Sequence, residues 1–390
     1  LRLAQIGWLA HPFSVDLYLE ATATRSKLVI ARILGGEAYW PYGLEQFSAR
    51  LADAGVLFAA LPGDDKPDEA LFRASSVDRE TWEALWAYCV EGGPANAANL
   101  LLYGQYLLGR AEKPVTAKPL LRAGLYWPGE GVADLDAVRA HWTDSAPIAA
   151  LVFYRALVQG AGLNPVNRLV RTLMGEGLNP LPIFVASLKD PVSAATLSQL
   201  FQEAPPDIVL NGTSFAVSSP DPENWRDARP VTPLDALGAP VFQVVFASGS
   251  EEAWEAGAQG LAPRDIAMNV ALPEVDGRVL TRAVSFKSEA YRDEATECPI
   301  AADRARGDRI AFVAKLAANW ARLARKPEAD RRVALIHANY PNKDGRLANG
   351  VGLDTPAATV RTLAALRDAG YSVEDAPATS DALMASILAG

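Results

Sequence analysis

The feature that most constrains the fold is a series of short apolar runs that alternate with helical patterns. The run "PIAALVFY" at 147–154 precedes "PVNRLVRTLMGEG" at 165–177, which begins with proline and ends at glycine, as helices do. Further strands of the series are predicted at 182–187, 207–213 and 240–247, with helices at 193–203 and 251–260. Such runs, separated by helices, indicate βαβ units. They predict a doubly wound, flavodoxin-like α/β domain over 145–290, closed by a strand in 265–277.

The segments on either side repeat the same alternation. Before residue 145, strands are predicted at 3–9, 55–61 and 122–128, and helices at 43–54, 81–90 and 97–108. After residue 290 we expect a connecting helix over 300–326, a strand in the run "RVALI", a helix beginning with Thr355 as its N-cap, and a strand at 372–377. The fold class is therefore α/β, with consecutive doubly wound parallel-sheet domains and a helical connector. The expected domains are 1–144 (incomplete at its start), 145–290, and 291–390, where the connector leads into a truncated α/β domain.

Charge and cysteine content exclude several classes of protein. The 390 residues carry a net charge of −9, and no basic run of five or more residues occurs, which argues against a nucleic-acid partner. Cys89 and Cys298 are the only cysteines, so neither a disulfide framework nor a thiolate zinc site is expected, and the protein is predicted to be cytoplasmic. The longest uncharged run, 92–109, is too polar for a membrane span.

The glycine-rich stretches do not match nucleotide-binding motifs. "HANYPNKDGRLANGVGLDTP" at 337–356 places Gly345 and Gly350 at P-loop spacing, but Val351 and Gly352 follow instead of Lys and Ser/Thr. "GAGLNP" at 160–165 has proline where a dinucleotide fingerprint needs its third glycine. No nucleotide site is predicted in this chain.

Two acids in "LPEVDGR" are the first candidates for acid–base chemistry. Glu274 and Asp276 are expected directly after a strand, where residues two apart in an extended segment point the same way. A carboxylate there could accept a proton or bind a metal, and a solvated turn is the equally weighted alternative. The three histidines are scattered, although His11 and His337 each follow an apolar run directly. For each of them a structural or surface role competes with a ligand role.

Several long segments resemble one family, the large subunit of cobaltochelatase. They include "HPFSVDLYLEATATRSKLVIARILGGEAYWPYG" at 11–43, "LVFYRALVQGAGLNPVNRL" at 151–169 and "GLAPRDIAMNVALPEVDGRVLTRAVSFK" at 260–287. "RAGLYWPGEG" at 122–131, "DIVLNGTSFAVS" at 207–218 and the stretch 337–356 are similar too. The large subunit of magnesium chelatase is a more distant resemblance. The family's subunit is considerably longer, so we expect an N-terminal portion that lacks the downstream domains.

The resemblance implies a tetrapyrrole-binding subunit of a metal chelatase (a ligase that forms nitrogen–metal bonds). In the cobalt enzyme the substrates are Co²⁺ and hydrogenobyrinic acid a,c-diamide, in the aerobic route to cobalamin. Two smaller subunits, one an AAA+ ATPase, bind ATP and Mg²⁺ in that family, which agrees with the missing phosphate loop here. The alternatives are a magnesium chelatase, a non-catalytic tetrapyrrole- or metal-binding module, and a scaffold for the ATPase partners.

The reaction that the resemblance implies assigns candidate roles to residues in the matching segments. Ring N–H protons must be accepted, and the candidates are Glu274 and Asp276, followed by His337. Arginines suit the carboxylates of the substrate, and asparagines suit its amides. The expected substrate-binding residues are Arg264, Arg282, Arg346, Asn339, Asn342, Asn349 and His11. No cobalt ligands are assigned.

Overall fold

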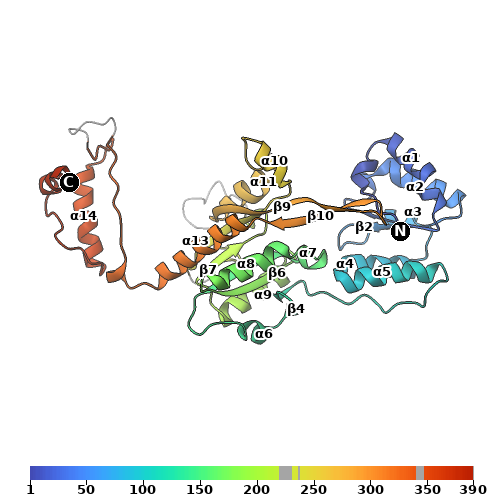
Figure 1. Cartoon of the computed structure of the whole chain (residues 1–390), viewed down its shortest axis with the longest axis horizontal. Coiled ribbons are helices and arrows are strands. Elements are labelled where there is room, and N and C mark those ends of the chain that lie inside the picture. Colours follow the sequence, from blue (N-terminus) through green and yellow to red (C-terminus); the bar gives the residue numbers. More distant parts are fainter. Residues whose placement is uncertain (219–230, 236–237, 340–346, 390) are drawn as a thin grey trace. The chain divides into compact units, whose positions relative to one another are not determined.

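The computed structural model describes residues 1–218, 231–235, 238–339 and 347–389 (Figure 1). The chain forms two compact units, Leu1–Ala317 and Ala318–Gly390. Within the residues described, no helix combines the length and the apolar character needed to cross a membrane.

Five parallel strands form the centre of the first unit. In chain order they are β5 (Ile148–Tyr154), β6 (Asn179–Val185), β7 (Ile208–Asn211), β8 (Val241–Phe246) and β9 (Val279–Asp293). Their order in the sheet is β6-β5-β7-β8-β9, which is the 2-1-3-4-5 order of flavodoxin-like folds. The predicted α/β class and its parallel sheet are therefore confirmed.

Antiparallel strands extend this sheet at both edges. On one side β3 (Ala123–Trp127) pairs with β6, and β4 (Gly131–Ala133) pairs with β3. On the other side β10 (Cys298–Ala305) pairs with β9. The pairing of β9 with β8 ends at Ser285, so the rest of β9 pairs with β10 and forms a hairpin that continues past the carboxyl end of β8 (Figure 1).

Helices cover the central sheet and explain its apolar strands. Strands β5 and β6 are buried at almost every position, as expected for parallel strands with both faces covered. Helix α8 buries Val166, Leu169, Val170 and Leu173 at helical spacing, and full burial of each such side chain contributes about 1.5–3 kcal/mol. The helices of this part are α6 (Leu135–Arg139), α7 (Arg155–Gln159), α8 (Asn164–Gly175), α9 (Pro191–Glu203), α10 (Glu251–Ala256) and α13 (Gly307–Arg325).

The N-terminal part of the first unit is built on two parallel strands, β1 (Leu28–Ile33) and β2 (Leu57–Pro62). Along β2, Phe58 and Ala60 belong to one buried cluster, whereas Ala59 and Leu61 belong to another. This alternation shows that helices cover both faces of the strand pair. They are α1 (Pro12–Ala21), α2 (Pro41–Asp53), α3 (Glu69–Ala74), α4 (Arg79–Glu91) and α5 (Gly93–Leu107). The strand expected at 3–9 is wrong, because Ile6–Leu9 forms a 3₁₀ helix.

The strand expected in 265–277 is also wrong. This segment is helical up to Val275, with α11 (Pro263–Ile266), a π-helical turn (Ala267–Ala271) and α12 (Leu272–Val275). Its buried residues recur at helical spacing, but three of them are polar, so the apolar pattern did not reveal the helix. They are Asp265, Asn269, Pro273 and Asp276. The fifth parallel strand, β9, begins only at Val279.

The second unit contains α14 (Thr355–Asp368) and α15 (Ser380–Ala389). Asp354, rather than Thr355, caps α14, because its carboxylate accepts the Ala357 N–H at 3.1 Å. The strands expected in "RVALI" and at 372–377 are wrong: in the described residues of this unit, β structure is limited to the isolated bridges Asn339–Leu347 and Gly350–Leu353.

Candidate functional site

The carboxyl ends of the five parallel strands are where a flavodoxin-like sheet binds ligands, above all where the strand order reverses between β5 and β7. β5 ends at Tyr154 and is followed directly by α7, whereas β7 ends at Asn211 and is followed by a polar loop. The hydroxyl of Tyr154 donates to the carbonyl of Ser214 at 3.2 Å and accepts the Ser214 N–H at 3.0 Å. This pair of hydrogen bonds joins the end of β5 to the loop after β7 at the reversal point.

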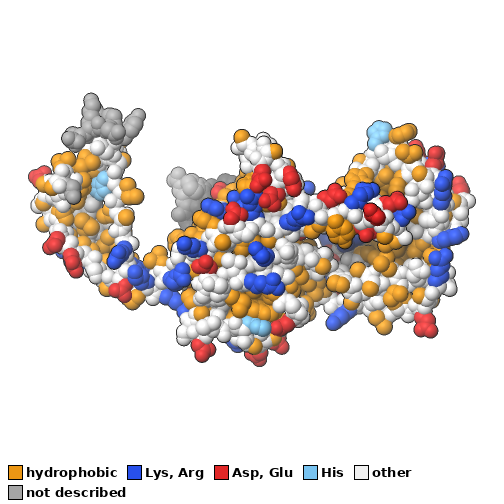
Figure 2. Space-filling model, in the orientation of Figure 1, with side chains coloured by type: hydrophobic (Ala, Val, Ile, Leu, Met, Phe, Trp, Pro, Cys, Tyr) orange, Lys and Arg blue, Asp and Glu red, His pale blue; other side chains and the backbone are white. Residues whose placement is uncertain are grey.

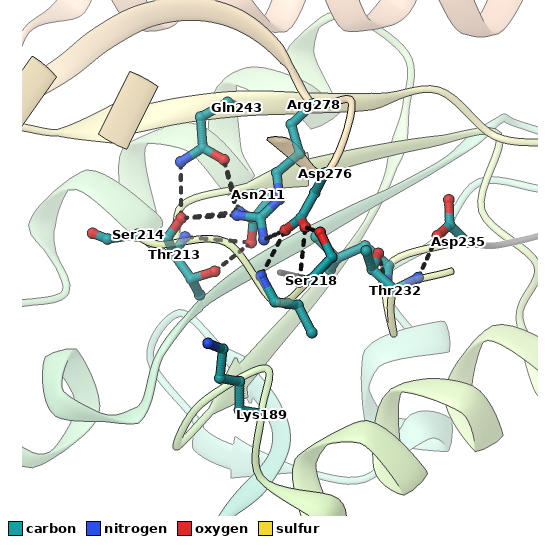
Figure 3. Close-up of polar contacts among 12 residues, drawn as sticks. Lys189, Asn211, Thr213, Ser214, Ser218, Thr232, Asp235, Gln243, Asp276 and Arg278 are labelled. Atoms are coloured by element: carbon teal, nitrogen blue, oxygen red, sulfur yellow. Dashed lines mark hydrogen bonds and ion pairs between the residues drawn. The ribbon is translucent and has the colours of Figure 1, made fainter. Parts of the chain in front are cut away.

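A buried amide pair fixes the loop that follows β7 (Figure 3). Asn211 and Gln243 lie opposite each other in β7 and β8, and Asn211 Nδ2 donates to Gln243 Oε1 at 2.8 Å. Both amides also donate to the carbonyl of Thr213, at 3.0 and 2.8 Å. Because buried amides must find partners, this arrangement leaves the loop with a single defined conformation.

Asp276 is the centre of a second buried network beside this loop (Figure 3). Its carboxylate accepts the N–H groups of Val217 and Ser218 at 2.8 and 3.0 Å, together with the Ser218 hydroxyl. Arg278 Nη2 lies 2.5 Å from Asp276 Oδ2, and its Nη1 reaches the carbonyl of Thr213 at 3.4 Å. Both charged side chains are at most 1% exposed. Asp276 therefore anchors the loop after β7 to the start of β9.

The electrostatics of this network keep Asp276 ionised. Burial alone would raise the pKa of Asp276, but the hydrogen bonds from Ser218 and Val217 and the charge of Arg278 outweigh it, so the pKa lies below its ordinary value. A proton that binds this carboxylate must displace one of the hydrogen bonds that the carboxylate already accepts. The geometry therefore suits an anchoring carboxylate.

The helical run 263–275 separates the two acids that the sequence singled out. The expectation that Glu274 and Asp276 point the same way from an extended segment is wrong, because α12 ends between them. Asp276 is buried, whereas Glu274 is exposed and its carboxylate makes no hydrogen bond or ion pair with the residues that the structure describes.

A third set of polar contacts, which sequence reasoning missed, ties the loops after β7 and β8 to α11. The Ser214 hydroxyl donates to Asn269 Oδ1 at 2.6 Å, and Asn269 Nδ2 donates to Asp265 Oδ1 at 3.2 Å. The Asp265 carboxylate accepts the Ser248 N–H at 3.0 Å. The four-residue spacing of Asp265 and Asn269 was the available signal, since it places both on one face of a helix.

Lys189 is a further residue at this edge that the sequence analysis did not select. It follows β6 on an exposed loop, and its backbone N–H donates to the Ser187 hydroxyl at 3.1 Å. In Figure 3 its ammonium group points toward the loop that carries Thr213.

Three other predicted site residues lie elsewhere in the first unit. Arg264 is exposed on α11. The Arg282 guanidinium stacks on the ring of Phe312, with its carbon 3.5 Å from the ring centroid. His11 caps α1, because its Nδ1 accepts the Phe13 N–H at 3.2 Å.

The remaining predicted residues belong to the second unit. His337 Nε2 lies 3.3 Å from the Thr359 hydroxyl, and its buried Nδ1 has no hydrogen-bond partner among the described residues. Asn339 forms the bridge to Leu347, and Asn349 is exposed. Asn342 and Arg346 lie outside the described residues.

The described residues form no cluster of metal ligands, and the face shown in Figure 2 carries charges of both signs. Among the residues described, no three His, Cys, Asp or Glu side chains gather in a way that could hold a metal ion. On the face seen in Figure 2, Lys and Arg side chains are interspersed with Asp and Glu. The hydrogen-bond networks at the carboxyl edge are built largely from buried polar side chains.

Comparisons with known proteins show which family the chain resembles. Residues 86–390 match the family described as CobN/Magnesium Chelatase. The aerobic cobaltochelatase subunit CobN of Sinorhizobium sp is 48% identical over 398 residues, which take in 100% of this chain and 31% of that protein. The catalytic subunit of cobaltochelatase from Mycobacterium tuberculosis has a similar structure, with a TM-score of 0.71 at 28% identity, covering 100% of this chain and 30% of that one.

A magnesium enzyme is more distant. A magnesium-chelatase protein of Chlorobaculum parvum is 25% identical over 322 residues, which take in 77% of this chain and 23% of that protein. The chain spans less than a third of the length of each of these relatives. With a family match over most of its residues and 48% identity along its whole length, the chain belongs to the CobN/Magnesium Chelatase family.

Proposed function

We propose that this chain is the tetrapyrrole-binding portion of the large subunit of an ATP-dependent cobaltochelatase. The complete enzyme inserts Co²⁺ into hydrogenobyrinic acid a,c-diamide during aerobic cobalamin biosynthesis. The observation that carries this proposal is the 48% identity, over the whole chain, to a protein named aerobic cobaltochelatase subunit CobN. Cys89 and Cys298 are both unpaired, which supports a reducing, cytoplasmic location.

Metal insertion requires a group that accepts a ring N–H proton, and Glu274 is the first candidate. Its carboxylate is exposed and unpaired in the described part of the chain, so it is available to a substrate. Asp276 contributes by holding the adjacent loop and Arg278 in place. His337 is a further proton acceptor, because one ring nitrogen has no hydrogen-bond partner in the described chain.

The periphery of the macrocycle carries carboxylates and amides, which suit the other candidate residues. Arg264, Arg282 and Arg346 offer paired N–H donors to carboxylates. Asn339, Asn342 and Asn349 offer both donors and acceptors to amides, and His11 completes the set of proposed contacts.

Nucleotide hydrolysis belongs to partner subunits in this proposal. The glycine-rich stretches 160–165 and 337–356 lack the residues that hold phosphates and magnesium. As the resemblance implies, two smaller subunits, one of them an AAA+ ATPase, bind ATP and Mg²⁺ and drive insertion.

The first experiment measures binding. The intact large subunit is titrated with hydrogenobyrinic acid a,c-diamide in the absence of ATP, and the absorbance spectrum of the tetrapyrrole is recorded. We expect a saturable spectral shift. No shift with the diamide, together with a shift for a porphyrin, would favour the magnesium chelatase alternative.

The second experiment tests Glu274. Glu274→Gln should bind the diamide as the wild type does but insert Co²⁺ at least about 100-fold more slowly when the partners and ATP are present. Glu252→Gln, which changes an exposed acid of α10, is the matched control and should insert at the wild-type rate. Unchanged insertion by Glu274→Gln would remove this residue from the mechanism.

A further inference from the structure

The base of the β9–β10 hairpin presents one face with unsatisfied polar groups. In the ladder Ser285 lies opposite Ala305, and Lys287 lies opposite Asp303. Because side chains alternate between the two faces of a strand pair, these four residues share one face. Ser285 and Asp303 are diagonal neighbours on it, roughly 7–8 Å apart at the backbone.

Asp303 is a partly buried carboxylate without a hydrogen-bond partner among the described residues. It lies against the loop between α7 and α8, where a Cβ atom added to Gly162 would come within 3.0 Å of Asp303 Oδ2. Burial raises the pKa of Asp303, and the charge of Lys287 across the ladder only partly offsets this. A desolvated, unpaired carboxylate at such a position is a typical mark of a functional group.

Ser285 adds an independent observation. Its side chain is completely buried, and its hydroxyl has no hydrogen-bond partner among the residues that the structure describes. Its backbone carbonyl, by contrast, accepts the Ala247 N–H at 2.9 Å. Buried hydroxyls almost always have partners, so this one, on the same ladder face as the unpaired Asp303 carboxylate, shows that the fold leaves polar groups unsatisfied at the hairpin base.

The hairpin base adjoins the carboxyl edge of the central sheet. The Ala305 N–H donates to Asn164 Oδ1 at 3.1 Å, which places the end of β10 beside the loop that follows α7. The Lys287 N–H donates to the carbonyl of Gly249 at 2.9 Å, in the loop that follows β8. Both loops belong to the edge where flavodoxin-like sheets bind ligands.

We propose that Asp303 accepts a hydrogen bond from a ring N–H group of the tetrapyrrole and takes the proton of that group during insertion. In this step the N–H bond breaks and its electron pair stays on nitrogen. An O–H bond forms on the carboxylate, the freed nitrogen binds Co²⁺, and Asp303 then releases the proton to water. This inference rests on the proposed function and adds a second proton acceptor to it.

Few charged groups surround Asp303 to compete with the substrate. Lys287 faces it from β9, and the loop 160–163 carries no titratable side chain. On α8, the Arg168 guanidinium lies toward the start of α13, 3.4 Å from a Cβ atom added to Gly307. The pH dependence of insertion should therefore follow the carboxylate under the influence of Lys287.

The test uses the intact large subunit with its partners and ATP. Asp303→Asn should bind the diamide within about threefold of wild type, yet insert Co²⁺ about 100-fold more slowly and lose the acidic limb of the pH–rate profile. Glu294→Gln, which changes an exposed acid in the turn of the same hairpin, is the control and should match wild type. If wild type neither binds nor inserts, the proposed function fails. If wild type is active and Asp303→Asn inserts within about twofold of it, this inference fails.

A second variant separates ligand binding from folding. Removing an unsatisfied buried hydroxyl costs the fold little, so Ser285→Ala should unfold at the wild-type temperature or above it. Because the hydroxyl is buried away from the substrate, the same variant should bind the diamide and insert Co²⁺ as the wild type does. Weaker binding or slower insertion by Ser285→Ala would contradict the assignment of this chemistry to Asp303 alone.

Discussion

Two carboxylates of the same sheet domain, Asp276 and Asp303, have opposite surroundings. Asp276 is fully buried and accepts hydrogen bonds from Val217, Ser218 and Arg278. Asp303 is only partly buried, and no hydrogen bond from the described residues reaches it. Burial alone would raise the pKa of Asp276, but its hydrogen bonds and the charge of Arg278 bring this pKa below its ordinary value. Burial raises the pKa of Asp303.

The surroundings of a carboxylate distinguish an acid that stabilises the fold from one that is available to a substrate. When a carboxylate that already accepts hydrogen bonds from its own protein takes up a proton, the fold loses stability. When a desolvated, unpaired carboxylate takes up a proton, the fold loses no hydrogen bond, and the carboxylate can accept a hydrogen bond from a ligand. On this reasoning Asp276 anchors the loop after β7, and Asp303 serves the substrate.

The largest expected effect comes from breaking the buried ion pair. Asp276→Ala should lower the free energy of unfolding by about 3–5 kcal/mol, because Arg278 is left buried without its counter-charge. Chemical denaturation of the chain measures this. The double variant Asp276→Ala/Arg278→Met should recover much of the loss, since the stranded charge is gone. A single-variant loss below about 1 kcal/mol would contradict the anchoring function.

Acid should remove the same stabilisation in the wild type. The pKa of Asp276 in the fold lies below its ordinary value of 3.8, so its contribution is complete above that pH and is lost as the pH falls through the folded pKa. Urea denaturation between about pH 7 and pH 2 should therefore show the advantage of wild type over the double variant shrinking below about pH 4. An advantage that stays constant down to the lowest pH would mean that the pair does not depend on ionised Asp276.

The smallest expected effect has the opposite sign. The pKa of Asp303 in the fold lies above 3.8, so its ionisation opposes folding once the pH exceeds that value. Asp303→Asn should therefore raise the unfolding temperature at neutral pH. The gain in the free energy of unfolding should be less than about 1 kcal/mol, because the side chain is partly exposed. Glu294→Gln should leave the temperature unchanged. A lower unfolding temperature for Asp303→Asn would make this acid a structural one.

The central sheet could be predicted because its strands are nearly continuous apolar runs, such as 147–154 and 240–247. The fifth strand was misplaced because the helix before it buries polar residues, Asp265 and Asn269 among them. The run "RVALI" shows the converse. It is apolar, yet Ile336 is 93% exposed and the described residues supply no partner strand.

The candidate site was only partly accessible from the sequence. Glu274 and Asp276 were singled out, but their different burial depends on the helix that ends between them. Ser285 and Asp303 could not be paired, because their proximity depends on the register of two strands. Asn211 and Gln243 likewise meet only across neighbouring strands, because they are 32 residues apart in the chain.

Hydrogen–deuterium exchange can show where the large subunit binds its ligand. The intact subunit is compared with and without hydrogenobyrinic acid a,c-diamide, in the absence of ATP. We predict slower exchange in the segments 160–164, 247–250, 285–289 and 301–305, which surround the hairpin base at the carboxyl edge. Saturating diamide that slows exchange elsewhere in the subunit but leaves all four segments unchanged would contradict the account.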